Sequence, residues 1–110
     1  NMANGDITKE YENDKIEVVL TWAIQVRKAT KIMEEQSDGS KKELTRSFHR
    51  HVVNPFSSVA NKDSEGNTTG WTHTATDISG EDADVQAIAN AAWTDSVKTA
   101  YKTYRESQTT

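Results

Sequence analysis

Polar and apolar residues alternate along the first half of the chain. The run KIEVVL at 15–20 is rich in β-branched residues, and WAIQVRKATKI at 22–32 places an apolar or small side chain at nearly every second position, with Lys28 as the one break. A period of two is typical of a half-buried strand, because successive side chains leave a pleated backbone on opposite faces. The pattern predicts two consecutive strands.

A turn and a third strand follow. The segment SDGS at 37–40 predicts a hairpin turn, since glycine supplies the positive φ that tight turns need. A three-residue loop at 38–40 brings the apolar residues of 22–32 and of the next strand, 41–53, onto one face, whereas a two-residue loop mixes polar with apolar positions. We therefore expect the three-residue loop. The expected apolar face holds Trp22, Ile24, Val26, Thr30, Ile32, Leu44, Phe48 and Val52.

The same register gives the hairpin a polar outer face. It places His49 and His51 beside Arg27 and Lys31, away from the expected core. These four residues are a candidate surface for a protein or nucleic-acid partner, since clustered cations attract carboxylates and phosphates. A solvated strand face without a partner is the plainer interpretation of the same pattern.

The middle of the chain is polar. Asn54-Pro55 ends the third strand, because proline cannot donate to a ladder, and 54–70 is expected to be a mobile loop. The run WTHTAT at 71–76 alternates and predicts a short fourth strand, placed at an edge. Residues 1–14 are expected to form a flexible lead-in, and 106–110 a C-terminal tail.

Apolar residues recur at spacings of three and four across 79–105, which predicts one long amphipathic helix with Ser79 as its N-cap. At 1.5 Å per residue such a helix would span roughly 37 Å, so its apolar stripe can outrun one small sheet. We expect the surplus to mediate self-association. The residues expected at that contact are Trp93, Val97, Tyr101 and Tyr104. The aromatic residues of this stripe could instead line a ligand pocket, although aromatics at helical spacing are more often core or interface.

Together these elements predict an α+β fold. We expect an antiparallel meander of three to four strands over about 15–76, with the 79–105 helix packed on its apolar face, in a single domain at 15–105. The core is thin, because only 34% of the 110 residues are hydrophobic and no cysteine can supply a disulfide. A core of that kind is often completed by oligomerisation or docking on a partner.

The net charge of −4 is unevenly distributed. Basic residues predominate between 25 and 52, whereas 63–95 contains acidic residues and no basic one. A basic and an acidic face can dock on each other or on neighbouring copies, and the overall negative charge disfavours nucleic acid as a whole-surface partner.

The sequence offers little for catalysis or cofactor binding. His49-x-His51 is the only spacing that suits a metal, with His73 as a conceivable third ligand, but zinc takes three or four ligands and no cysteine is present. The acidic residues near the predicted helix start lack the glycine-punctuated spacing of a calcium loop; they are Asp77, Glu81, Asp82 and Asp84. We find no serine elbow, phosphate-cradling glycine loop or nucleophilic cysteine, and therefore predict a non-enzymatic protein without a cofactor or a metal.

Two stretches carry a family resemblance: RSFHRHV at 46–52 and DISGEDADVQAIANAAWTDSVKTAY at 77–101. They resemble small uncharacterised proteins of tailed bacteriophages that infect marine cyanobacteria, and the similarity extends over most of 14–104. The segment 57–69 is longer here than is usual in that group. The resemblance implies no catalytic residues, and it implies either a virion component or an accessory factor acting in the host cell.

Our functional expectation follows from the stripe, the thin core and this resemblance. It is a virion-associated or assembly protein that acts by self-association and docking on other phage proteins. The alternative is an accessory protein that binds a host protein or nucleic acid through Arg27, Lys31, His49 and His51. No apolar run approaches the roughly 20 residues needed to cross a bilayer and no signal peptide is present, so we expect it in the virion or the host cytoplasm.

Overall fold

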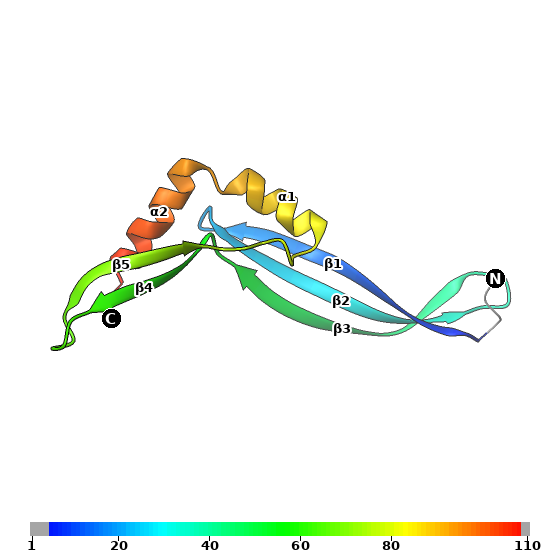
Figure 1. The fold of residues 1–110 in the computed structure, drawn as a ribbon. Coiled ribbons are helices and arrows are strands. Elements are labelled where there is room, and N and C mark those ends of the chain that lie inside the picture. The colour runs from blue at the N-terminus through cyan, green and yellow to red at the C-terminus, as the bar shows by residue number, and fades with distance from the viewer. Residues whose placement is uncertain (1–4, 109–110) are drawn as a thin grey trace. The chain divides into compact units, whose positions relative to one another are not determined.

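The computed structural model describes residues 5–108, in which the chain forms five strands and two helices (Figure 1). In chain order they are β1 (Ile7–Val19), β2 (Ala23–Glu35), β3 (Lys41–Val53), β4 (Phe56–Lys62), β5 (Thr68–Ala75), α1 (Ala83–Ala92) and α2 (Asp95–Glu106). One sheet has the order β1-β2-β3, and β4 and β5 form a separate two-stranded sheet. The predicted α+β class and the three-stranded meander are confirmed.

The described chain divides into two compact units. Unit 1 contains residues 5–16 and 26–51, and unit 2 contains residues 17–25 and 52–108. Val26 and Ala29 are the buried apolar residues of unit 1. Unit 2 has the larger core, made of Ile24, Val53, Val85, Ala89 and Tyr101.

β3 does not contribute the expected core residues. Leu44, Phe48 and Val52 are 47%, 43% and 55% exposed, so the prediction that they are buried is wrong. Among the strands of residues 5–108, β3 lies at an edge and has a neighbour on one side only. In addition, the guanidinium of Arg27 lies 4.4 Å from the centre of the Phe48 ring, so Phe48 lies on the charged face of β2.

The β2–β3 loop has the predicted length but begins one residue earlier. Gln36 N–H donates to the carbonyl oxygen of Ser40 at 2.7 Å, which leaves residues 37–39 as the loop. Gly39 closes it with a φ of 88°, in the left-handed region that only glycine adopts freely. Asp38 accepts hydrogen bonds from the hydroxyl and the backbone N–H of Ser40, and these hold the pKa of Asp38 below its usual value.

The predicted loop at 54–70 is wrong, because it contains β4 and the start of β5. β4 pairs antiparallel with β5, from Phe56 opposite Ala75 to Lys62 opposite Thr68. The connecting loop, 64–66, again has three residues and ends in a glycine, Gly66, with a φ of 84°. Ser57, Ser58 and Asn61 in β4 suggested a loop, but the backbone of this polar segment is held as a strand by its pairing with β5.

The N-terminal region also differs from expectation. β1 begins at Ile7, so the described part of the predicted lead-in at 1–14 is largely strand; residues 1–4 lie outside the described residues. Acidic residues occupy every second position here, at Glu10, Glu12 and Asp14. This is the period of a strand, but a search for apolar periodicity overlooks it because the repeated residues are charged. Of the predicted tail at 106–110, residues 107–108 follow α2, and 109–110 lie outside the described residues.

The single long helix predicted at 79–105 is replaced by α1 and α2. Trp93 leaves the helical conformation with a ψ of 67°, and Thr94 caps α2 by accepting a hydrogen bond from Val97 N–H. Threonine at an N-cap satisfies a donor that a helix start leaves unpaired, so it competes with continuation of the first helix. The N-cap of α1 is Asp82 rather than Ser79. Neither of the helices in the described part of the chain has the length and apolarity to cross a membrane.

Candidate functional site

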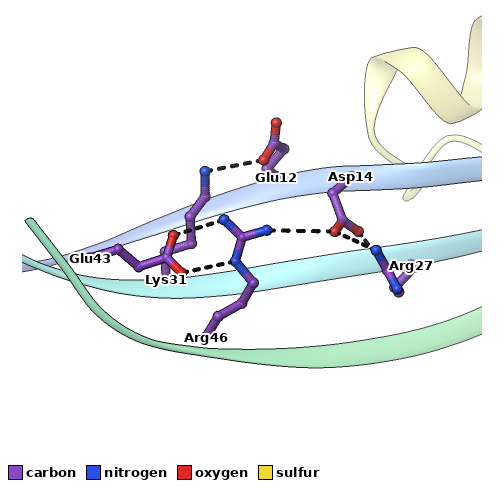
Figure 2. A network of polar contacts seen from close by, with 6 residues as sticks. All are labelled: Glu12, Asp14, Arg27, Lys31, Glu43 and Arg46. Carbon is purple, nitrogen blue, oxygen red and sulfur yellow. Dashed lines mark hydrogen bonds and ion pairs between the residues drawn. The ribbon is translucent and has the colours of Figure 1, made fainter.

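A network of ion pairs covers one face of unit 1 (Figure 2). Asp14 on β1 accepts two hydrogen bonds from Arg27 on β2, with Nε–Oδ1 at 2.9 Å and Nη2–Oδ2 at 2.8 Å. Lys31 Nζ lies 3.1 Å from Glu12 Oε1. Strand alternation places Ala29 between Arg27 and Lys31 on this face, and it is buried because long charged side chains cover small residues with their stems.

β3 contributes further charges to this network. Arg46 makes two hydrogen bonds to Glu43, the shorter at 2.7 Å, and its Nη1 lies 3.9 Å from Asp14 Oδ2. Lys41 Nζ lies 3.2 Å from Glu10 Oε2. The hydrogen bonds from Arg27 hold the pKa of Asp14 below its usual value, and those from Arg46 lower the pKa of Glu43.

The network changes the predicted partner surface. Arg27 and Lys31 are both ion-paired with carboxylates of β1, and Phe48 rather than His49 lies against Arg27. His49 and His51 stack on each other with ring centres 6.2 Å apart, on the face of β3 opposite Phe48. The four residues therefore do not form one surface: Arg27 and Lys31 belong to the ion-pair network, and His49 and His51 form a separate pair. The signal that the sequence analysis missed is the acidic alternation of β1.

An aromatic cluster organises unit 2. The ring of Trp22, in the turn just before β2, lies 5.6 Å from Tyr101 and 5.3 Å from Tyr104, both on α2. The indole N–H of Trp93 donates to the backbone carbonyl of Trp22 at 2.8 Å. Two residues of the predicted self-association surface, Trp93 and Tyr101, are thus engaged inside unit 2. Val97 is half-buried, and Tyr104 remains 42% exposed.

A pocket of about 430 Å³ opens beside this cluster. Its lining comprises Leu20, Trp22, Ala23, Val52, Asn54, Tyr101, Tyr104, Arg105 and Gln108. Its volume lies within the range of roughly 300–1,000 Å³ that is usual for ligand pockets. Arg105 is the one charged side chain among these described lining residues. The combination of three aromatic rings, packed edge-on and tilted against one another, an arginine and two side-chain amides is suited to bind an apolar group that carries an anion.

The turn at the mouth of the pocket has an unfavourable backbone. Leu20 and Thr21 have φ values of 59° and 70°, both in the left-handed region. Hairpin turns that need two such residues usually contain Asn-Gly. The left-handed conformation costs about 1–2 kcal/mol for a residue with a Cβ, and a β-branched residue such as threonine suffers most. This turn places the side chain of Leu20 in the pocket lining, where the residue is 62% exposed.

A second polar arrangement in unit 2 has the order of a catalytic triad. Ser58 Oγ lies 2.7 Å from His73 Nδ1, and His73 Nε2 lies 2.6 Å from Glu106 Oε2. In a hydrolase the serine faces the substrate and the acid is buried. Here Ser58 is buried and Glu106 is exposed, so the burial is reversed and the three residues tie β4 and β5 to α2. No single-sequence pattern links residues that are this far apart.

The described histidines and acidic residues do not gather into a group of three that could hold a metal ion. Both ring nitrogens of His73 are engaged by Ser58 and Glu106. Over residues 5–108, no group of three or more His, Cys, Asp or Glu side chains is placed to hold a metal ion. Asp77 instead accepts a hydrogen bond from Ser79 N–H, which lowers the pKa of Asp77.

Comparisons with known proteins give no relative: the chain matches no protein-family model, no curated protein and no solved structure.

Proposed function

We propose that the protein is a non-enzymatic subunit that assembles with copies of itself through the open edges of the β1-β2-β3 sheet. The observation that supports this best is β3, a 13-residue edge strand that is exposed at every position except His51 and Val53. Among the described residues no other strand pairs with its outer edge or with that of β1. Such edges present unpaired N–H and C=O groups, which a strand of another chain can pair with.

The two edges carry opposite charge. β1 contains Glu10, Glu12, Asp14 and Glu17 with Lys9 and Lys15. β3 contains Lys41, Lys42, Arg46 and Arg50 with Glu43. The formal charges are therefore −2 for β1 and +3 for β3. Glu10 and Asp14 pair with Lys41 and Arg46 inside one chain, so what each edge offers a neighbouring copy is its net charge. Because opposite charges stabilise paired strands and like charges destabilise them, β3 of one copy suits β1 of the next better than β3 of a second copy.

Apolar side chains on both edges add to this complementarity. Leu44 on β3 and Tyr11 on β1 are exposed, and burying a large apolar side chain contributes about 1.5–3 kcal/mol. A head-to-tail contact of this kind repeats from copy to copy, so it closes into a ring or extends into a filament. Both outcomes are forms of a structural assembly.

Two single substitutions test the proposal. Leu44→Lys places a charge on the β3 edge, and Tyr11→Lys does the same on the β1 edge; both sites are exposed, so the fold should persist. By sedimentation velocity at roughly 10–200 µM, a range typical of moderate affinities, the wild-type protein should form oligomers and each variant should sediment as a monomer. Val59→Lys, at an exposed position of β4, is the matched control and should assemble like the wild type.

Mixing the variants separates the two modes of pairing. Each variant keeps one intact edge, so a head-to-tail contact predicts that the mixture forms a heterodimer and nothing larger. If Tyr11→Lys assembles like the wild type, β3 pairs with β3 and the head-to-tail mode is wrong. A wild-type protein that stays monomeric across the whole range contradicts the proposal altogether.

The biological setting that we propose for this assembly is based on the resemblance to phage proteins described above. We propose a virion-associated or assembly role, which mass spectrometry of purified particles tests by the presence or absence of the chain. The alternative, an accessory protein that binds a host protein or nucleic acid, has less support, because Arg27 and Lys31 are already ion-paired within unit 1. Recovery of host rather than phage proteins in a pull-down would favour that alternative.

A further inference from the structure

The geometry points to a second binding function, in unit 2: the aromatic pocket takes the carboxyl-terminal residue of a partner polypeptide. The apolar side chain of that residue would lie against Trp22 and Tyr104, and its terminal carboxylate would lie on Arg105. This inference does not depend on the sheet edges of unit 1. It rests on the free donors of Arg105, the charge of unit 2 and the exposed rim of the pocket.

Arg105 is held in place without being neutralised. Its Nη1 donates to the hydroxyl of Tyr101 and its Nη2 to the backbone carbonyl of Ser58, both at 3.3 Å. A guanidinium has more N–H donors than these two bonds use, and a carboxylate is the ligand that its fork geometry matches best. Arg105 has no carboxylate partner among the residues that the structure describes, since the adjacent Glu106 bonds to His73.

The charge of unit 2 limits the ligand to a small number of negative charges. Its described acidic residues are Glu17, Asp63, Glu65, Asp77, Glu81, Asp82, Asp84, Asp95 and Glu106. Its basic residues are Lys62, Lys98, Lys102 and Arg105. A unit with a formal charge of −5 repels a polyanion such as single-stranded nucleic acid, whereas one pocket arginine suits one carboxylate.

The rim of the pocket indicates a ligand larger than the pocket itself. Leu20, Val52 and Tyr104 are 62%, 55% and 42% exposed, and all three line it. A small molecule inside would leave much of this apolar surface in water, whereas a polypeptide that enters by its end would also cover the rim. The strained turn at Leu20 and Thr21 is consistent with this, because unfavourable backbone conformations persist where a site needs them.

A pair of peptides provides the first test. The probe is acetyl-Ala-Leu-Phe with a free carboxylate, and its control is the same peptide with a C-terminal amide. Titration of the full chain, followed by indole resonances of Trp22 and Trp93 in ¹H–¹⁵N NMR spectra, should show saturable binding of the acid. The affinity of the amide should be lower by a factor of about ten or more, since a hydrogen bond to a charged group is worth about 1.5–3 kcal/mol.

Substitutions then locate the site. Arg105→Gln should reduce binding of the acid to the level of the amide, and Tyr104→Ala should weaken both peptides. Because Arg105 also bonds to Tyr101 and Ser58, the exposed Tyr104 provides a second variant if Arg105→Gln does not fold.

The strained turn offers a matched comparison. The double variant Leu20→Asn with Thr21→Gly should raise the melting temperature and weaken peptide binding, because it relieves the backbone and removes the apolar rim. Thr21→Gly alone relieves part of the strain and keeps Leu20, so it should bind the peptide as well as the wild type.

Three results would overturn the inference. The first is equal affinity for the acid and the amide, and the second is binding of the acid that survives both Arg105→Gln and Tyr104→Ala. The third is the absence of any spectral change up to about 10 mM peptide, a concentration at which a site with a Kd of about 1 mM is nearly saturated. Binding of oligothymidine in place of the peptide would also reject it, in favour of stacking on the aromatic rings.

Discussion

Asp14 connects the three strands of unit 1. It accepts two hydrogen bonds from Arg27 and lies within ion-pair distance of Arg46, so one carboxylate of β1 contacts cations of both β2 and β3 (Figure 2). Its side chain is only 11% exposed. A charged hydrogen bond in such a position is less screened than a surface ion pair, which makes this residue sensitive to acid.

The sign of the pH dependence follows from the direction of the shift. The pKa of Asp14 in the folded state is below its unfolded value, so its stabilising effect is present above about pH 4 and is lost as the pH falls through the folded pKa. Asp14→Asn should therefore lower the melting temperature at pH 7. The difference from the wild type should shrink steadily below about pH 4, because protonated aspartate resembles asparagine.

The matched control is Glu65→Gln, in the β4–β5 loop. Over residues 5–108 only its backbone N–H makes a hydrogen bond, to Asp63 Oδ1, and the substitution removes the same charge. It should follow the wild-type melting curve at each pH. A difference between wild type and Asp14→Asn that stays constant down to pH 2 would show that the ion pairs of Asp14 do not stabilise the fold.

At the same scale, the sequence predicted which residues are polar but not what they contact. Arg27 and Lys31 lie on the polar face of β2 as expected, whereas their partners, Asp14 and Glu12, were assigned to a lead-in. Phe48 was assigned to the core because of its parity with Leu44, yet it lies against Arg27. Alternation settles which side chains share a face only while a strand stays regular and paired on both sides.

At the scale of elements, the two hairpin loops 37–39 and 64–66 are alike. Each ends in a glycine with a positive φ, and a Cβ at either glycine would meet no atom within 4 Å. Substitution there is therefore costly through backbone conformation alone. Gly39→Ala and Gly66→Ala should each destabilise the fold by about 1–2 kcal/mol, measured by urea unfolding.

Gly80→Ala is the control for these substitutions. Gly80 also has open space around its Cα, but its φ is not in the left-handed region. Alanine at this position should leave the free energy of unfolding unchanged or raise it slightly. Equal losses at Gly39 and Gly80 would contradict the conformational explanation.

The same elements show how far sequence patterns reach. SDGS predicted the first loop, and SEGN at 64–67 carries the same signal, but the polar strand beside it concealed the second hairpin. The helical stripe was correctly located, and its interruption at Thr94 was not foreseen. The apolar stripe continues in phase through Trp93, so its periodicity gave no sign of the break. The helix is interrupted because Thr94 acts as the N-cap of a second helix.

At the scale of the whole molecule, composition predicted a thin core, and the structure has few buried apolar residues in either unit. The buried apolar residues over 5–108 are Ile24, Val26, Ala29, Val53, Val85, Ala89 and Tyr101. A chain of this composition gains stability from contacts with other chains. No periodicity in one sequence identifies those contacts, because an open strand edge consists of backbone groups that every residue shares.

Assembly through the edges should make stability depend on concentration. If oligomers form only from folded chains, mass action raises the melting temperature as the protein concentration rises. Scanning calorimetry between about 5 and 500 µM, a hundredfold range worth about 2.7 kcal/mol by mass action, should show this increase for the wild type. Leu44→Lys should melt at one temperature throughout, and a wild-type value that does not change would argue against coupled assembly.

The engagement of His73 has a consequence for chemical labelling. Diethyl pyrocarbonate acylates an imidazole nitrogen through its lone pair, and in His73 both nitrogens are occupied by Ser58 and Glu106. His49 has an exposed ring on a strand edge and should be carbethoxylated first. Peptide mapping of the order of modification then reports on the closure of unit 2: early labelling of His73 would mean that α2 separates from β5 in solution.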